Sequence, residues 1–315
     1  MKVDLSWVFS PQKRRLDRRT PSEALMDIAA QGKKAETLRK LHGGPRVLVL
    51  PNAWDVASAC VLEQMGYPAI ATTSAGVAFA LGYPDGQRIS RDEMLDVVAR
   101  IARAVRVPVT ADMESGYGTT PAEMAETAKA IVAAGAVGLN FEDITGDTES
   151  SHVQTSLQVE KLRTIREVSA AMGVSLVINA RTDVYLMPIG PEATRFDRTV
   201  ERLRAYRAAG ADCVFAPGLV DRGLIGKLVK AVEAPLNVLA TPGCPAIPEL
   251  EALGVRRVSI GSGVMRATLG LVRRIGKELM ERGTYSAVND GTIPYTEITE
   301  LMTRAASNSA EKAHG

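Results

Sequence analysis

Short apolar segments alternate along this chain with longer segments whose apolar residues recur at helical spacing. The short segments are rich in Val, Ile, Leu and Ala, and they occupy residues 47–50, 69–72, 109–111, 138–141, 176–179, 213–216, 236–239 and 258–261. Helical spacing is clear in residues 91–105, 122–134 and 198–209. Eight strands that alternate with helices predict a parallel sheet closed into a (β/α)₈ barrel, the TIM-barrel architecture. We expect residues 31–305 to form this single domain.

The two ends of the chain lack the alternation. Residues 1–30 contain a basic run, from Lys13 to Arg19, among Ser, Pro and Gln, with little apolar periodicity. This composition predicts a solvated and partly mobile leader. Residues 306–315 are mostly small or polar, and we expect them to form a similar tail.

Composition and charge narrow the function classes. Hydrophobic residues make up 46% of the chain, charged residues 23%, and the formal net charge is +2. This small charge gives no field that favours a nucleic-acid or membrane partner, so a small-molecule ligand is expected. We find no apolar run of about 18 residues, no secretion signal, and three widely spaced cysteines. These features favour a cytoplasmic protein without a disulfide framework.

Polar residues gather where the predicted strands end, which is where barrels of this type place their chemistry. Asp112 and Glu114 follow the third strand, and Glu142 follows the fourth. If the backbone at residues 112–114 is extended, both of its acids point to one face, toward Glu142. Clustered carboxylates repel one another unless a hard divalent cation such as Mg²⁺ or Mn²⁺ binds between them. The alternative is that these acids only cap helices or lie in solvated loops.

Two further strand ends carry candidate substrate contacts. Arg181 follows the fifth strand, and its planar guanidinium suits a carboxylate with two oxygens, unless it forms a salt bridge with Asp183 or Glu142. Ser74, Ala75 and Gly76 follow the second strand, and they offer a hydroxyl and backbone amides for a second carboxylate or an oxyanion.

Six motifs in this order resemble the isocitrate lyase/phosphoenolpyruvate mutase superfamily over residues 40–275. They are Pro51-Asn-Ala-Trp-Asp55, Thr73-Ser-Ala-Gly76, Gly82-Tyr-Pro-Asp-Gly86, Asp112-Met-Glu-Ser-Gly-Tyr-Gly118, Asn140-Phe-Glu-Asp143 and Asn179-Ala-Arg-Thr-Asp183. The resemblance implies a Mg²⁺-dependent barrel that cleaves C–C or P–C bonds beside a carboxylate through an enolate. It also implies a homotetramer, a dimer of dimers in which paired subunits exchange their last helix.

The resemblance also implies residue roles. Asp112 matches a direct metal ligand, whereas Glu114 and Glu142 match acids that hold metal-bound waters. The remaining matches concern the substrate: Ser74, Ala75, Gly76, Trp54, Asp85, Asn179, Arg181 and Asn237 are the candidates for binding it. Glu114 departs from the family pattern, which has Asp there, and this favours a water-mediated contact over a direct one.

A second departure concerns the loop after the fourth strand. Lyases of the superfamily carry Lys-[Lys/Arg]-Cys-Gly-His there, but this chain has Thr148-Glu-Ser-Ser-His152, with Ser150 at the cysteine position. A serine hydroxyl is a far weaker proton donor than a thiol, so ordinary isocitrate or methylisocitrate lyase activity is not expected. His152 is either the acid/base that replaces the cysteine or an exposed loop residue. In the second case the proton comes from water or Tyr117.

Three hypotheses about function follow. The first is a Mg²⁺-dependent lyase or decarboxylase that cleaves a C–C bond of a small oxo- or hydroxy-acid and releases a pyruvate-like enolate. The second is P–C chemistry, by a mutase or hydrolase acting on phosphoenolpyruvate or phosphonopyruvate. The third is a non-catalytic barrel that keeps the metal site and has lost the loop chemistry.

Overall fold

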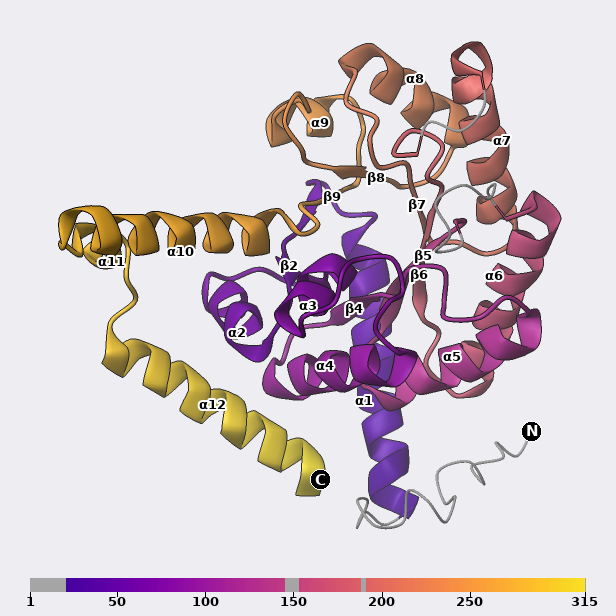
Figure 1. Cartoon of the computed structure of the whole chain (residues 1–315). Helices are drawn as coiled ribbons and strands as arrows, with labels where there is room; N and C mark the ends of the chain where they lie inside the picture. The colour runs from indigo at the N-terminus through magenta and orange to yellow at the C-terminus, as the bar shows by residue number, and fades with distance from the viewer. Residues whose placement is uncertain (1–20, 145–152, 188–190, 315) are drawn as a thin grey trace.

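The computed structural model describes residues 21–144, 153–187 and 191–314, and it has one sheet of parallel strands surrounded by helices (Figure 1). The strands follow one another around the sheet in the order β1-β9-β8-β7-β6-β5-β4-β3-β2. Their bounds are β1 Leu48–Leu50, β2 Asn52–Ala53, β3 Ile70–Thr72, β4 Val109–Asp112, β5 Gly138–Glu142, β6 Val177–Arg181, β7 Cys213–Phe215, β8 Leu236–Leu239 and β9 Arg257–Ser259.

The two strands at the ends of this order, β1 and β2, are halves of one extended segment that Pro51 interrupts. β1 pairs with β9, while β2 pairs with β3, so the segment joins both edges of the sheet. Proline lacks an N–H and cannot donate to a neighbouring strand, although the Pro51 carbonyl still accepts from Ala71 N at 3.1 Å. The Asn52 side chain spans the joint, because Nδ2 donates to Thr72 O and Oδ1 accepts from Gly261 N, both at 2.8 Å. The predicted barrel is confirmed.

Helices follow most strands and cover the outside of the barrel. They are α2 Val56–Gln64, α3 Ser74–Ala80, α4 Arg91–Ala104, α5 Pro121–Ala133, α6 Thr155–Ala171, the 3₁₀ turn η2 Glu192–Thr194, α7 Arg195–Ala208, α8 Arg222–Val232 and α9 Ile247–Ala252. Ser90 and Thr120 begin α4 and α5 with reciprocal capping boxes. After α5 and α7, Gly135 and Gly210 adopt φ values of 83° and 105°, which other residues rarely reach, and the chain turns back into the next strand.

Alternate residues of a strand point into the barrel, and β5 shows which chemistry lies there. Leu139 and Phe141 pack outward in the main apolar core. Gly138, Asn140 and Glu142 point inward. A side chain at Gly138 would meet the Val177 carbonyl at 2.7 Å, so this position needs glycine for lack of space. Above it, Asn140 and then Glu142 form successive polar layers toward the carboxyl ends of the strands.

Helix α1, Pro21–Leu41, covers the amino ends of the strands (Figure 1). Leu38 is fully buried, Gln31 Nε2 donates to the Val132 and Ala136 carbonyls, and Arg39 binds Asp212. The helix begins at Pro21, so it includes the last residues of the segment that composition assigned to the leader. Long polar side chains anchor it, and apolar periodicity does not report such contacts.

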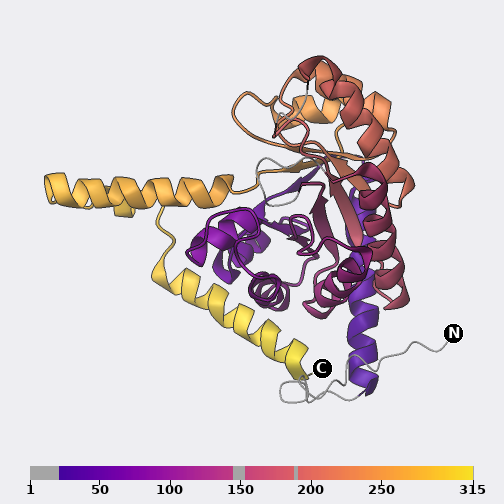
Figure 2. The ribbon, with the colours of Figure 1, turned by 45° about the vertical axis from the view of Figure 1, so that its right-hand side comes forward.

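The last three helices extend from the barrel and return to it. Figures 1 and 2 show α10, Gly263–Arg282, projecting outward, followed by the short α11, Ser286–Asn289, and then α12, Tyr295–His314. α12 packs on α2 and α4 of the same chain, where Asn308 Nδ2 donates to the Ala104 carbonyl at 2.9 Å. The expected polar tail is thus helical as far as His314. Exchange of this helix between subunits remains a prediction. Among the described helices, none combines the length and apolarity that crossing a membrane requires.

Candidate active site

Three adjacent strands place polar side chains at their carboxyl ends. β4 ends at Asp112, β5 at Glu142 and β6 at Arg181. The register sets Asp112 opposite Asn140 and Glu142 opposite Arg181. Parallel strands in register bring their carboxyl ends to one rim, which explains why residues about 70 positions apart meet there.

Asp112 is held by hydrogen bonds on both of its carboxylate oxygens. Oδ2 accepts from Ser74 N at 2.9 Å and Ser74 Oγ at 2.8 Å, and Oδ1 accepts from Asn140 Nδ2 at 3.3 Å. Its backbone N–H donates to Thr72 Oγ1 at 2.8 Å. The residue Asp112 is only 8% exposed, so these donors replace the water that its carboxylate loses on burial.

Glu114 lies beyond the strand, in a turn that is closed by a hydrogen bond from Gly116 N to Met113 O at 2.8 Å. Its φ of 49° is left-handed, so the expectation of extended backbone through residues 112–114 is wrong. The turn still brings Glu114 into the cluster, because its carbonyl accepts from Glu142 N at 2.9 Å. Burial, followed by the negative charges of Asp112 and Asp85, raises the pKa of Glu114 to about 8.

Glu142 and Arg181 form a buried ion pair, with 2.7 Å between Oε2 and Nη1. Arg181 also donates from Nε and Nη2 to both oxygens of Asp183, at 2.6 and 2.9 Å, and its guanidinium lies 5.9 Å from the Phe215 ring centre. The alternative of a salt bridge is therefore what the structure shows. Burial raises the pKa of Glu142 well above its ordinary value, although Arg181 opposes this effect.

The rim carries more negative than positive charge. Asp85 belongs to an exposed segment, but its carboxyl group is partly desolvated. This desolvation is the larger cause of its raised pKa, and the negative charge of Asp112 is the second cause. Among the described residues, the acids that surround Arg181 here are Asp85, Asp112, Glu114, Glu142 and Asp183. Within the described ranges, no three His, Cys, Asp or Glu side chains are close enough to enclose a metal ion. The donor set and the excess charge fit a divalent cation held by one carboxylate and several waters, a common Mg²⁺ arrangement.

A family model described as phosphoenolpyruvate phosphomutase matches residues 38–280. The chain belongs to the phosphoenolpyruvate phosphomutase family. A solved structure from Burkholderia cenocepacia J2315, provisionally assigned as a lyase/mutase, is 38% identical, covers 87% of this chain and 96% of its own, and superimposes with a TM-score of 0.81. The 2-methylisocitrate lyase of Aeropyrum pernix is 28% identical over 84% of this chain and 86% of its own length. The oxaloacetate decarboxylase of Rhodopseudomonas palustris is 27% identical over 85% of this chain and 92% of its own length.

These matches confirm the resemblance to the isocitrate lyase/phosphoenolpyruvate mutase superfamily, and the relatives include lyases and decarboxylases that act on small acids. The structure places three of the expected substrate contacts at the start of one helix. Ser74, Ala75 and Gly76 form the first turn of α3, and both donors of Ser74 are bound to Asp112. Trp54 packs beside Gly76, where an added Cβ would lie 3.1 Å from the Trp54 Cβ.

Two asparagines expected at the substrate lie deeper in the barrel. Asn179 is fully buried and donates to Asn140 Oδ1 at 2.8 Å. Asn237 does not end its strand, which continues to Leu239, and its Nδ2 donates to Ser259 Oγ at 3.2 Å. Both therefore belong to the amide layers below the rim, where the alternation of strand side chains directs them inward.

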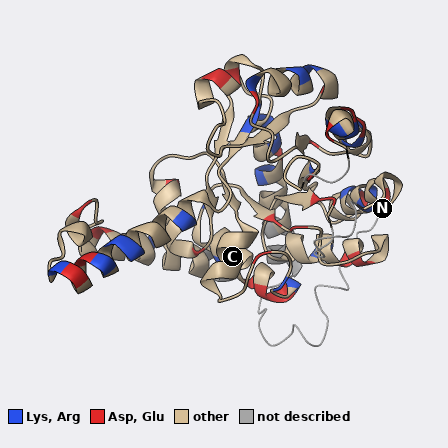
Figure 3. Cartoon of the chain, turned by 45° about the horizontal axis from the view of Figure 1, so that its top comes forward, with Lys and Arg blue, Asp and Glu red and all other residues tan. Residues whose placement is uncertain are grey.

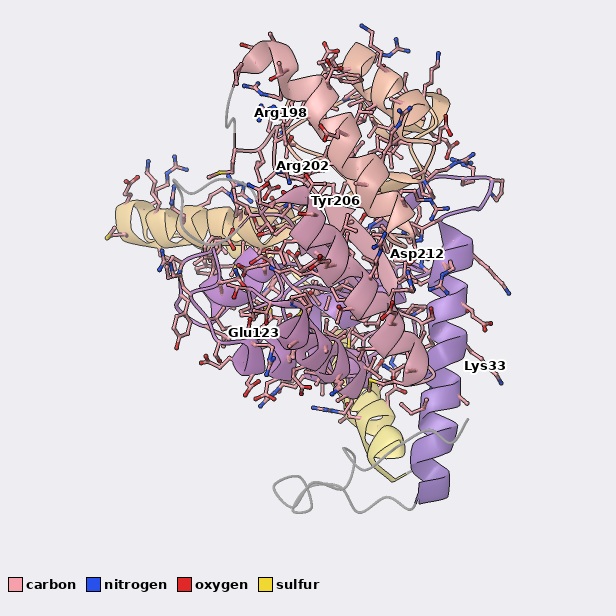
Figure 4. All side chains as sticks on the ribbon, turned by 90° about the vertical axis from the view of Figure 1, so that its right-hand side faces the viewer. Lys33, Glu123, Arg198, Arg202, Tyr206 and Asp212 are labelled. Carbon is pink, nitrogen blue, oxygen red and sulfur yellow. The ribbon has the colours of Figure 1, made fainter. Side chains whose placement is uncertain are left out.

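The two loop residues expected to move the proton, Ser150 and His152, lie outside the described residues. The ends of that loop are described, and a buried cluster holds them. Asp143 O accepts from Val153 N at 2.9 Å, and Asp143 Oδ2 accepts from Arg202 Nη1 at 2.9 Å and Tyr206 Oη at 2.6 Å. Figure 4 shows Arg202 and Tyr206 on α7. This cluster was not predicted from the sequence, although the acid directly after Glu142 was a signal for it.

Proposed function

We propose that this protein is a Mg²⁺-dependent lyase or decarboxylase that cleaves a C–C bond of a small oxo- or hydroxy-acid and releases a pyruvate-like enolate. The observation that carries the proposal is the buried cluster of Asp112, Glu114 and Glu142. Two of its members have raised pKa values and one accepts hydrogen bonds on both oxygens. Buried like charges are costly, so such a cluster is typical of a site that binds a cation.

In this proposal Asp112 holds the metal directly, while Glu114 and Glu142 hold its water ligands. Ser74 and Asn140 fix the Asp112 carboxylate, so the ligand has one orientation before the metal arrives. Bound there, Mg²⁺ supplies Lewis-acid stabilisation of the negative charge that develops on the substrate oxygen. Mn²⁺ prefers the same oxygen ligands and is expected to substitute.

Arg181 is proposed to hold the substrate carboxylate. Asp183 keeps two of the guanidinium nitrogens in place, and only Nη1 is bound to Glu142. If Glu142 held a water ligand of the metal, Nη1 of Arg181 would be left for a substrate carboxylate. Asp183 then acts as the residue that orients Arg181, which explains why the fork is occupied before substrate binds.

We propose that His152 moves the proton, with Ser150 at the position where related lyases have cysteine. Tyr117 is the alternative donor, since its hydroxyl lies 3.5 Å from Glu114 Oε1. Burial, followed by the charge of Glu114, raises the Tyr117 pKa, which keeps the phenol protonated at neutral pH.

The second candidate function is P–C bond chemistry, as mutase or hydrolase on a phosphonopyruvate-like substrate. The description of the matching family favours it. The same acids and Arg181 would serve either reaction, because both leave a pyruvate-type fragment beside the metal site. The two therefore differ in product and not in the residues that we have described.

We propose that the protein works as a cytoplasmic homo-oligomer, a dimer of dimers that exchange their last helix. The exposed apolar side chains on α10 support this, among them Val272 and Met280, which are 59% and 85% exposed. Figure 3 shows charged residues of both signs along the projecting helix α10, as expected for a helix that packs on a protein and not in a lipid bilayer.

The test is a product assay with Mg²⁺ and three substrates: oxaloacetate, 2-methylisocitrate and phosphonopyruvate. Pyruvate is measured by coupling to lactate dehydrogenase and phosphate by a colorimetric assay. We expect wild type to release pyruvate from an oxo- or hydroxy-acid and to release no phosphate. Asp112→Asn should lose this activity completely while its circular dichroism spectrum stays unchanged. The variant also corrects for decarboxylation catalysed by free Mg²⁺. Phosphate release from phosphonopyruvate would favour the hydrolase form of the second candidate, and formation of phosphoenolpyruvate, detected by adding pyruvate kinase and ADP, would favour the mutase form. If Asp112→Asn, assayed in EDTA, were as active as wild type, the metal site would be refuted.

A further inference from the structure

A residue outside the matched motifs makes contact with the turn that carries Glu114. Gln87 follows Asp85 and Gly86 in the segment between α3 and α4. Its φ of 55° is left-handed, a conformation that is unfavourable for a residue with a side chain. A non-glycine residue stays in such a conformation only when its surroundings hold it there.

The surroundings of Gln87 are the turn itself. Gln87 Nε2 donates to Ser115 Oγ at 2.6 Å, and Gln87 Oε1 accepts from Tyr117 N at 2.9 Å. The backbone N–H of Gln87 also donates to the Glu114 carboxylate. Gln87 thus binds three groups of the turn: the carboxylate of Glu114, the hydroxyl of Ser115 and the backbone amide of Tyr117.

The turn needs such support because its own backbone is unfavourable. Glu114 and Tyr117 have φ values of 49° and 58°, and both are non-glycine residues. Gly116 between them fits only because it lacks a side chain, since a Cβ there would lie 2.5 Å from Met124 Sδ. Left-handed residues that cluster at one place point to a constrained functional segment.

The other side of Gln87 offers little packing. A cavity of about 740 Å³ is lined by Gln87 and Tyr117, together with residues 86–92 and two acids of α5, but by none of Asp112, Glu114 and Glu142. The hydrogen bonds to the turn, and not a packed core, are therefore what orient the Gln87 side chain.

We propose that Gln87 is a positioning residue that ties the Asp85 segment to the Glu114 turn and thereby fixes Glu114 for its role at the metal. This inference rests on the proposed function, because it assigns a consequence to the position of Glu114. Gln87 touches neither metal nor substrate in the proposal. It acts through Glu114 and Tyr117.

The test compares Gln87→Met, which keeps the length of the side chain and removes its hydrogen bonds, with Gln64→Ala as control. Gln64 is an exposed glutamine of α2 that binds Glu297. Mn²⁺ affinity is measured by electron paramagnetic resonance. We expect about a tenfold weaker Kd in Gln87→Met, no change in Gln64→Ala, and the same melting temperature in all three proteins. An unchanged Kd in Gln87→Met would overturn the inference.

Two further measurements keep the inference testable when the first is not decisive. If Gln87→Met melts at a lower temperature than wild type, a second variant, Ser115→Ala, removes only one of the hydrogen-bond partners of Gln87. The double variant Gln87→Met/Ser115→Ala should then bind Mn²⁺ no more weakly than Gln87→Met. Additive effects would contradict the coupling. If wild type binds no Mn²⁺, the proposed function fails, and hydrogen exchange of the amides of residues 113–118 tests this inference by itself. We expect exchange about tenfold faster in Gln87→Met, and equal exchange would overturn it.

Discussion

The raised pKa of Glu114 predicts a measurable dependence of stability on pH in the metal-free protein. Burial and the neighbouring acids raise this pKa from an ordinary 4.5 to about 8 in the folded state. A carboxyl group whose pKa is higher in the folded state favours folding while it is protonated. The stabilisation of the folded state by protonated Glu114 is therefore fully present below pH 4.5, declines as pH rises, and is lost above about pH 8. Glu114→Gln keeps the shape of the side chain and removes this titration.

The magnitude follows from the two pKa values. Between them, each pH unit costs the folded state about 1.4 kcal/mol, so the whole interval corresponds to at most about 5 kcal/mol. Between pH 5.5 and 7.5 the stability of Glu114→Gln should rise relative to wild type by about 2–3 kcal/mol. The lower end of this range allows for Asp112 and Asp85, whose repulsion the variant also relieves.

The assay is urea unfolding in EDTA, followed by circular dichroism at pH 5.5, 6.5 and 7.5. The control is Glu36→Gln, which removes an exposed charge on α1. Its stability difference from wild type should not change with pH. Added Mg²⁺ should raise the urea midpoint of wild type at pH 7.5 more than that of Glu114→Gln. A difference between Glu114→Gln and wild type that stays constant within about 0.5 kcal/mol across the three pH values would refute the reasoning.

Three further predictions concern other parts of the molecule. Asp212, which lies near α1 in Figure 4, joins α1 to the barrel by pairing with Arg39 and Arg166. Asp212→Ala should therefore lower the free energy of unfolding by about 2–4 kcal/mol, and a loss below about 1 kcal/mol in urea unfolding would contradict this. His152→Ala should lower kcat by about 10² to 10⁴ with unchanged Mn²⁺ affinity, and full activity would leave the proton to water or Tyr117. Glutamate substitutions at Val272 and Met280 together should give monomers by light scattering, whereas a monomeric wild type would contradict the oligomer.

The fold and the main acids could be predicted because they follow from periodic patterns. Alternation of strands and helices predicted the barrel, and the rule that barrels carry chemistry at strand ends selected Asp112, Glu142 and Arg181. These residues do lie together, because adjacent parallel strands in register must bring their ends to one rim. Their roles in catalysis remain proposals.

What could not be predicted depends on turns and on single long-range contacts. The turn at Glu114 is left-handed, and it places Gly116 against Met124, a contact that spacing along the chain does not encode. Arg181 was expected to be either a clamp or an ion-pair partner, and only the geometry shows that Asp183 and Glu142 both reach it. Gln87 lies in no periodic pattern. The start of α1 at Pro21 and the extension of α12 to His314 were not predicted, since composition alone made residues 1–30 and 306–315 look like solvated ends.

A buried cation below the rim explains how Asp112 can be held firmly without losing its capacity for a metal. Arg257 is fully buried, and its Nη2 donates to Asn140 Oδ1 at 3.1 Å, the same oxygen that accepts from Asn179. With two donors on this oxygen, the Asn140 amide must direct its nitrogen toward Asp112. A direct Arg257–Asp112 ion pair would neutralise the carboxylate, whereas the amide transmits orientation without contributing a net charge. The acids at the rim therefore keep the excess negative charge that a divalent cation is proposed to balance.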